Sequence, residues 1–138
     1  MATITDMLLK ANVDNVFELK TSTYKSKRLA ELLGSDTPIE ITISEIPQRK
    51  GMDIIQRQID KNGNIDFSKS FDTQLLLIVE SVVDPDLRDK DLQSKFKCRT
   101  PKELAEVMFG REVNELSQLI MSFSGLSDDE KEDEQVKN

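Results

Sequence analysis

The chain has 138 residues and a formal net charge of −7, with no histidine, no tryptophan and a single cysteine. Without histidine, the usual general base, the Ser–His and Cys–His nucleophile pairs and most zinc sites are missing, so we expect neither an enzyme nor a cofactor. No apolar run approaches the ~20 residues that cross a bilayer, and the negative charge disfavours nucleic acid as a partner. The composition predicts a soluble, cytoplasmic protein with an aliphatic core.

The acidic residues are concentrated near the C-terminus. Residues 127–138 carry six acids and two lysines, a net charge of −4, which leaves −3 for the rest of the chain. Such a polar segment has too little apolar surface to fold. We therefore predict one domain over residues 1–126 and a disordered, solubilising acidic tail over residues 127–138, with docking of the tail on a basic partner as the alternative.

Several elements are predicted in the first 34 residues. Over residues 15–22, around Phe17, apolar and polar side chains alternate, which predicts a strand. Residues 26–34 fit either a short helix that ends at Gly34 or a ragged strand. The first segment is predicted to be a helix because apolar residues recur at helical spacing behind a Thr3 cap: Ile4, Met7, Leu8 and Ala11.

A clearer strand follows at residues 38–47. This stretch begins and ends with proline and has isoleucine at every second position from Ile39 to Ile43. One face is therefore apolar and the other polar, as in a half-buried strand that is short or lies at a sheet edge. It can pair with the strand predicted at residues 15–22.

The chain beyond residue 50 is predicted to be helical. A first helix places Met52, Ile55 and Ile59 on one face and stops at Asn62-Gly63. A second, beginning after an Asp72 cap, is expected to be the most buried helix of the protein. Its apolar residues fall at i, i+3, i+4, i+7 and i+8: Leu75, Ile78, Val79, Val82 and Val83.

Further helices are indicated from residue 84 onward. Asp84 and Pro85 suit the cap and first position of a new turn. Residues 89–96 then form a short helix, and another begins at Thr100-Pro101, where a glutamate at position 103 completes a capping box. It stops at Gly110, and the last helix ends at Gly125 with this apolar face: Val113, Leu116, Leu119, Ile120 and Phe123. The predicted fold is α+β, a mainly α-helical single domain with a small antiparallel β element near the N-terminus.

The stretch "DKNGNIDF" at residues 60–67 resembles a calcium loop. Asp60, Asn62 and Asn64 fit the first three ligand positions of an EF-hand loop. The position that requires glycine is Ile65, however, and the position of the last ligand is Phe71, which has no oxygen. A turn that follows a helix is the favoured interpretation.

Two other polar sites are weighed. The acids of "DPDLRDKD", residues 84–91, suit magnesium or calcium, but helix capping explains them better. Cys98 is flanked by Lys97 and Arg99, whose charges favour a lowered thiol pKa, although a structural role is the usual one for a single cysteine.

The last two helices provide a candidate binding surface. Methionine and phenylalanine at positions 108, 109, 121 and 123 can repack against different partners, although helical spacing is more often core spacing. Met121 and Leu126 fall off the main apolar face, which predicts an apolar edge. The predicted partner-binding residues are Leu116, Ile120, Met121, Phe123 and Leu126.

Residues 38–126 resemble the XkdN-like tail assembly chaperones of tailed phages and defective prophages. An apolar helix precedes a D-P-x-L turn, a short L…F helix, a P-x-E-L helix and a final G-x-E…L…I…SG pattern. The residues that carry this order are Asp84, Pro85, Leu87, Leu92, Phe96, Pro101, Glu103, Leu104, Gly110, Glu112, Leu116, Ile120, Ser124 and Gly125.

The resemblance implies a non-enzymatic protein that binds the tape measure protein in the host cytoplasm and keeps it soluble during tail assembly. It also implies absence from the mature virion and, as further partners, the tail tube protein and a frameshifted longer form of the chain itself; a homo-oligomer is allowed. The rival hypotheses are a minor structural tail component and a divalent-cation-responsive binding protein.

Overall fold

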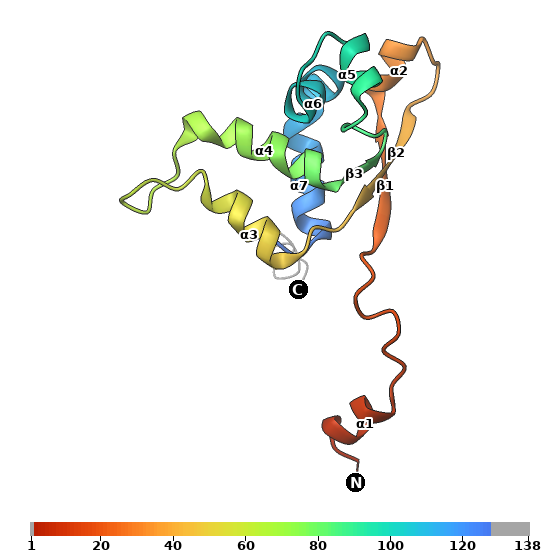
Figure 1. Ribbon diagram of the computed structural model, residues 1–138, viewed down its shortest axis with the longest axis vertical. Helices are drawn as coiled ribbons and strands as arrows, with labels where there is room; N and C mark the ends of the chain where they lie inside the picture. The colour runs from red at the N-terminus through yellow and green to blue at the C-terminus, as the bar shows by residue number, and fades with distance from the viewer. Residues whose placement is uncertain (1, 128–138) are drawn as a thin grey trace, which may run out of the picture.

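The computed structural model describes residues 2–127, so the predicted acidic tail lies outside the described residues apart from its first residue. The fold is α+β, as predicted, with helices packed on one side of a small antiparallel sheet (Figure 1). In chain order the elements are α1 Ile4–Lys10, β1 Thr21–Ser26, α2 Lys27–Leu33, β2 Ile39–Ser44, α3 Gln48–Gln56, α4 Phe67–Ser81, β3 Val82–Asp84, α5 Lys90–Lys95, α6 Pro101–Phe109, the 3-10 helix η1 Gly110–Glu112 and α7 Val113–Phe123.

The sheet has the order β1-β2-β3, which makes β2 the central strand. β1 and β2 pair antiparallel with Tyr24 opposite Ile41, and β2 pairs with β3 with Thr42 opposite Asp84. The alternation of β2 is confirmed, because Ile41 and Ile43 are buried. Of the two alternatives for this strand, short or at a sheet edge, the edge is wrong, because Val82–Asp84 forms a third strand beyond it. Val82 and Val83 had been predicted to be helical, and Asp84 to be a helix cap.

The first predicted strand is displaced. Residues 14–17 form a turn, the strand begins at Thr21, and Phe17 is 93% exposed. Of the two alternatives for residues 26–34, the helix is confirmed. Ser26 caps α2, and Gly34 ends it with φ +67°, a conformation that glycine adopts without steric cost.

The boundaries and faces of α3 and α4 differ from the prediction. α3 ends at Gln56, and it buries Ile54 rather than the predicted Met52 and Ile59. The start of α4 is capped by Asp66, so Asp72 lies inside the helix. The predicted start is therefore too late in the sequence, and the part of α4 that it left out carries the exposed Phe67 and Phe71.

The later helices agree better with their local signals. Thr100 caps α6, although Glu103 accepts from the backbone N of Arg99 rather than from that of the cap. The predicted helix start at Asp84 is wrong, because Asp84 is the last residue of β3. On α7, most of the predicted face is buried, but Leu119 is exposed.

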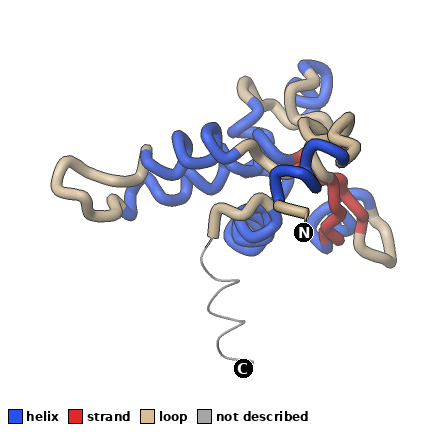
Figure 2. The backbone as a smooth tube through the Cα atoms, turned by 90° about the horizontal axis from the view of Figure 1, so that it is seen from below, coloured by secondary structure: helices blue, strands red, loops and turns tan. Residues whose placement is uncertain are grey.

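The core lies between the sheet and α4, which packs against α3, α6 and α7. Figure 2 shows the sheet on one side of these helices and the α3–α4 connection extending as a loop on the other. No helix among the described residues is long and apolar enough to span a membrane.

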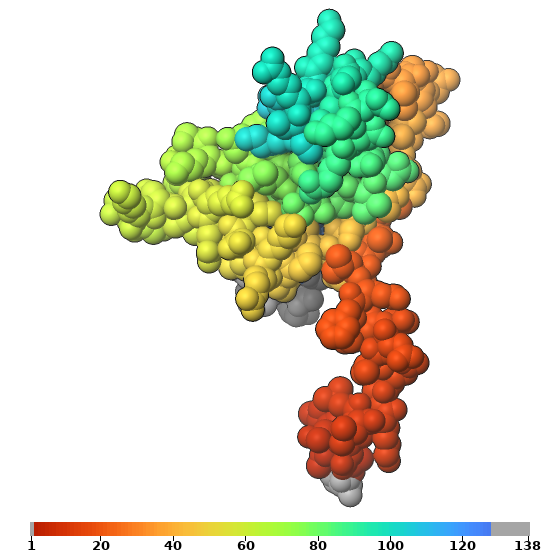
Figure 3. All heavy atoms as spheres, in the orientation of Figure 1, coloured from red at the N-terminus to blue at the C-terminus, as the bar shows by residue number. Residues whose placement is uncertain are grey.

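Residues 2–20, here called the N-terminal arm, project from this body (Figure 3). α1 forms its outer end and buries none of its residues. The arm joins the sheet at Lys20, whose backbone N donates to the Glu45 carboxylate at 3.0 Å and whose carbonyl accepts from the backbone N of Glu45 at 2.8 Å. The end of the arm that joins the sheet is therefore fixed by two hydrogen bonds.

Candidate functional site

Two of the five predicted partner-binding residues lie in the core. Leu116 and Ile120 are 0% exposed, on the side of α7 that packs against α4 and the rest of the core. They have no surface to offer a partner in this structure. Met108 and Phe109 of α6, part of the same proposed adaptable surface, are likewise buried.

Met121, Phe123 and Leu126 are half-buried and pack against the core. The Leu126 side chain lies against Gly51 of α3, where a Cβ would collide with it. Nearby, the Ser124 hydroxyl accepts from the backbone N of Ile46 at 2.9 Å. These contacts make the end of α7 a joint with α3, and a binding role for the half-buried side chains stays a prediction.

A larger apolar surface is found elsewhere, in a pocket of about 570 Å³ between α2 and α5. Most of its lining is aliphatic or aromatic, with Glu40, Asp84 and Lys95 as the charged members. The apolar and proline residues that line it come from several elements: Leu29, Leu32 and Leu33 of α2, Ile39 and Ile41 of β2, Pro85, Leu92 and Phe96 of and around α5, and Met108 of α6. We call this the α2–α5 pocket.

The α2 wall of the pocket is fixed by a buried carboxylate. Glu112 accepts a 2.6 Å hydrogen bond from the Ser26 hydroxyl and a 3.0 Å bond from the backbone N of Lys27. The Ser26 hydroxyl in turn accepts from the backbone N of Leu29, which caps α2. One glutamate thus satisfies donors at the start of α2 and ties that helix to α7.

Tyr24 extends this polar contact. Its hydroxyl donates to Glu115 at 3.3 Å. Burial raises the pKa of Tyr24 above its usual value, and the negative charges of Glu112 and Glu115 raise it further. The phenol therefore stays neutral and links β1 to α7.

The α5 wall is held by its own cap and by a side-chain amide. Asp89 accepts from the backbone N of Leu92 at 2.9 Å, and Gln93 donates to the carbonyl of Leu87 at 2.8 Å. These bonds place Leu92 and Phe96 on the pocket. Together with Asp84 and Pro85, four of the residues behind the family resemblance contribute to its lining.

The polar stretches singled out from the sequence are occupied by local hydrogen bonds. Asp60 accepts from the backbone N of Asn62 and of Asn64, which forms the turn, and Asp86 accepts from the backbone N of Arg88. Within residues 2–127, no group of three or more metal-ligating side chains occurs. The helix expected to run up to this turn ends earlier, at Gln56.

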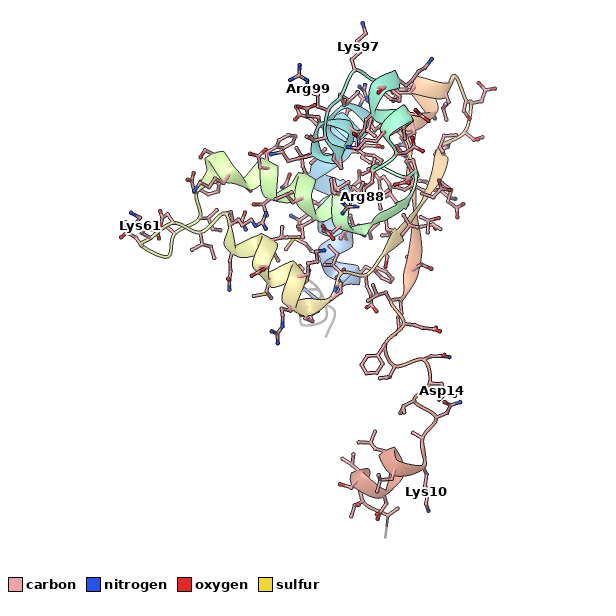
Figure 4. The ribbon with its side chains drawn as sticks, in the orientation of Figure 1. Lys10, Asp14, Lys61, Arg88, Lys97 and Arg99 are labelled. Carbon is pink, nitrogen blue, oxygen red and sulfur yellow. The ribbon has the colours of Figure 1, made fainter. Side chains whose placement is uncertain are left out.

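Of the two interpretations of Cys98, the lowered thiol pKa is contradicted, and the favoured structural role is not. Burial raises the pKa of its thiol, and the nearby Glu103 carboxylate raises it further. The adjacent cationic side chains do not compensate, because Lys97 and Arg99 point outward into solvent (Figure 4). A thiol in this setting is a weak nucleophile.

Sequence reasoning missed the α2–α5 pocket. Leu32 and Leu33 were visible only as part of an ambiguous helix or strand, yet both remain exposed after folding. The sequence signal that could have indicated the pocket is the number of leucines in this short helix, Leu29, Leu32 and Leu33, since one helix face cannot bury all of them.

The sequence model described as "Phage XkdN-like tail assembly chaperone protein, TAC" matches residues 5–137. The match includes the N-terminal arm, which the resemblance over residues 38–126 had left out. A crystal structure of the protein yqbn has a similar fold, with a TM-score of 0.55, 12% identity, and coverage of 85% of this chain and 98% of that chain. Among curated proteins, none matches the chain.

Proposed function

Because the chain belongs to the phage XkdN-like tail assembly chaperone family, we propose that it binds the tape measure protein of a phage tail and keeps it soluble during assembly. The interaction is non-covalent and non-enzymatic. The observation that carries the proposal, beside the family itself, is the α2–α5 pocket, an apolar surface left open to solvent by the folded chain.

The pocket suits the apolar side of an amphipathic helix. Its volume falls within the ~300–1,000 Å³ range of pockets that bury small apolar groups, so it accepts a few aliphatic side chains. Leu32 is 41% exposed and Leu33 is more exposed still, and both gain from being covered. This is the helix-in-groove mode of recognition, in which anchors at i, i+3, i+4 and i+7 enter one groove.

The net charge supports the same role. A chain with net charge −7 carries like charge onto any complex that it forms, and such charge opposes association between complexes. We propose that the pocket covers apolar helix faces of the client while the acidic surface keeps the complex dispersed.

Co-expression with the tape measure protein tests both parts of the proposal. We expect the tape measure protein to stay soluble and to co-purify with this chain. A Leu32→Glu variant should retain at least tenfold less client, since a carboxylate in an apolar contact costs more than the ~1.4 kcal/mol that a factor of ten represents. The matched control is Leu119→Glu, which changes a leucine of similar exposure, 39%, outside the pocket lining.

Each contrary outcome removes a different part of the proposal. A tape measure protein that is equally soluble without this chain removes the chaperone function. If both leucine variants bind client as well as the wild type, the pocket is the wrong surface, and Met121, Phe123 and Leu126 become the next residues to change.

We further propose that the protein acts in the host cytoplasm and is absent from the finished tail. Mass spectrometry of purified tails should then detect tail proteins without peptides of this chain. Its presence at a fixed ratio to the tail tube protein would instead support the minor structural component.

A further inference from the structure

The N-terminal arm is the most exposed apolar part of the described chain. Of the eighteen large apolar side chains exposed within residues 2–127, eight belong to the arm: Ile4, Met7, Leu8, Leu9, Val13, Val16, Phe17 and Leu19. α1 has only seven residues and buries none of them. A helix this short is marginal on its own, so its stability calls for a surface that covers it.

The arm and the α2–α5 pocket match in polarity. Ile4, Met7 and Leu8 lie at i, i+3 and i+4, on one side of α1, and an amphipathic helix of this kind is what the pocket accepts under the proposed function. The pocket is lined mainly by apolar side chains and is the larger of the two pockets described in residues 2–127.

Charge favours the same contact. Glu40 and Asp84 against Lys95 give the pocket lining a net charge of −1. On α1, the Asp6 carboxylate accepts from the backbone N of Thr3 in a capping box, whereas Lys10 makes no ion pair within the described residues. Asp6 keeps its negative charge in this capping box, so α1 is neutral overall, and the favourable contact is the local one that the Lys10 ammonium can make with Glu40 or Asp84 of the lining.

The direction of the arm decides which pocket it meets. The arm leaves the sheet at Lys20, before the start of β1, whereas the pocket lies at the other end of β1, where α2 begins. α1 and the pair α2 and α5 accordingly lie at opposite ends of the molecule (Figure 1), and Lys10 and Asp14 point into solvent far from the body (Figure 4). The ten residues from 11 to 20 span at most ~33 Å, which lets α1 reach a second molecule placed beyond the arm.

We propose that, without client, α1 of one copy occupies the α2–α5 pocket of a second copy. The contact is heterologous, since each molecule contributes an arm to one neighbour and a pocket to another. It rests on the proposed function only in taking the pocket as a site for amphipathic helices. The client and α1 then compete for one site, and the pocket is covered until client arrives.

Light scattering during size-exclusion chromatography, over a range of concentrations, tests the contact. The wild type should show an average mass above its monomer mass of 15.7 kDa, rising with concentration. Leu8→Asp, in the arm, and Leu32→Glu, in the pocket, should each run as a monomer, with association at least tenfold weaker. Leu119→Glu, outside both surfaces, should associate like the wild type.

Mixing the two monomeric variants is the sharper measurement. Leu8→Asp keeps a working pocket, and Leu32→Glu keeps a working arm, so the mixture should form a 1:1 dimer with one arm in one pocket. A mixture that stays monomeric overturns the proposal, as does association that persists in Leu8→Asp. Because α1 buries none of its residues, the Leu8→Asp change cannot unfold the body, and its circular dichroism spectrum verifies this.

The remaining outcomes are also decisive. A monomeric wild type whose α1 amides are protected from hydrogen exchange means that the arm folds onto its own pocket. A monomeric wild type without such protection leaves the arm for another partner; both results overturn the proposal.

Client binding separates this inference from the proposed function. Leu8→Asp should still solubilise the tape measure protein, and more readily than the wild type, because its pocket is never occupied by α1. If the variants complement each other but none retains client, the self-association stands and the proposed function fails. If client is retained through the pocket but no variant changes the mass, the proposed function stands and this inference fails.

Discussion

α7 and α1 both carry apolar residues at helical spacing, but only those of α7 are buried in the structure. α7 buries Val113, Leu116 and Ile120 against the core, whereas α1 leaves Ile4, Met7 and Leu8 exposed. The spacing of apolar residues thus indicates that a helix has a side to cover. It does not tell whether the covering surface belongs to the same chain.

The two helices differ in whether other parts of the chain pack against them, and the difference does not come from their end caps. α1 has a complete capping box between Thr3 and Asp6, while α7 follows directly on η1 and has no side-chain cap. α7 is instead held by α4 and by the hydrogen bonds of Glu112 to β1 and α2. Tertiary contacts therefore outweigh local end signals in these helices.

The largest expected effect compares a leucine-sized truncation in each helix. Ile120→Ala should lower the free energy of unfolding by about 2–5 kcal/mol, because it opens a cavity in a fully buried site. Leu8→Ala should change it by less than about 0.5 kcal/mol, as an exposed substitution does. Urea unfolding, at a concentration where the wild type is monomeric, measures both values.

If Leu8→Ala costs as much as Ile120→Ala under those conditions, the arm packs on its own body and the comparison between the two helices breaks down.

The next effect concerns the polar contact that anchors α7. Glu112→Ala leaves the buried Ser26 hydroxyl without its acceptor, so we expect a loss of about 1–3 kcal/mol in unfolding free energy. Glu115→Ala, in the first turn of α7, is the matched control, since that side chain is exposed and makes one 3.3 Å bond to Tyr24. Equal losses for both glutamates would show that burial of the carboxylate is not the cause.

The smallest expected effect is a shift in the pKa of Tyr24, measured by titration. Tyr24 is the only tyrosine of a chain that also lacks tryptophan. Its ultraviolet absorbance therefore reports ionisation of this phenol alone. Burial, then the charges of Glu112 and Glu115, raise its pKa in the folded state, so the midpoint should lie above that of the unfolded chain in urea, about 10.

The raised pKa of Tyr24 also fixes how the free energy of unfolding changes with pH. The folded state holds the phenol proton more tightly than the unfolded state, so this contribution is present below pH ~10 and is lost as the pH rises toward the folded-state pKa. Tyr24→Phe should show a smaller fall in unfolding free energy between pH 9 and 11 than the wild type. An identical fall in both proteins would mean that Tyr24 is not coupled to the fold.

Much of the fold was accessible from local sequence signals. α6 was placed correctly because Thr100, Pro101 and Gly110 mark its ends through their own backbone preferences. β2 was recognised because its alternating isoleucines fit one half-buried face. Such signals act within a few residues and need no knowledge of the rest of the chain.

The errors occur where contacts with residues distant in the sequence determine the secondary structure or the buried face of a segment. Val82 and Val83 continue the apolar pattern of α4, but they lie in a strand, because β2 pairs with Val82 and Asp84 on either side of Val83. Ile54 rather than Met52 is buried on α3, because the position of α4 selects the face. Neither choice can be read from the segment itself.

The candidate site was hardest to predict for the same reason. The predicted set on α7 was chosen for being apolar, and burial removed Leu116 and Ile120 from it. The α2–α5 pocket is assembled by residues from Leu29 to Met108, brought together by the sheet, by the Glu112 contact and by the hydrogen bonds that hold α5. A surface of this kind appears once the elements are packed.

The two edge strands of the sheet, β1 and β3, affect how the protein can associate at high concentration. β1 carries the exposed Lys25 in its length, and β3 has three residues followed by Pro85, which lacks an N–H. A lysine, a short strand and a proline all discourage a further strand from adding at an edge. Growth by strand addition is disfavoured at both edges of the sheet, so we expect the concentrated protein to remain thioflavin-negative whatever its state of association.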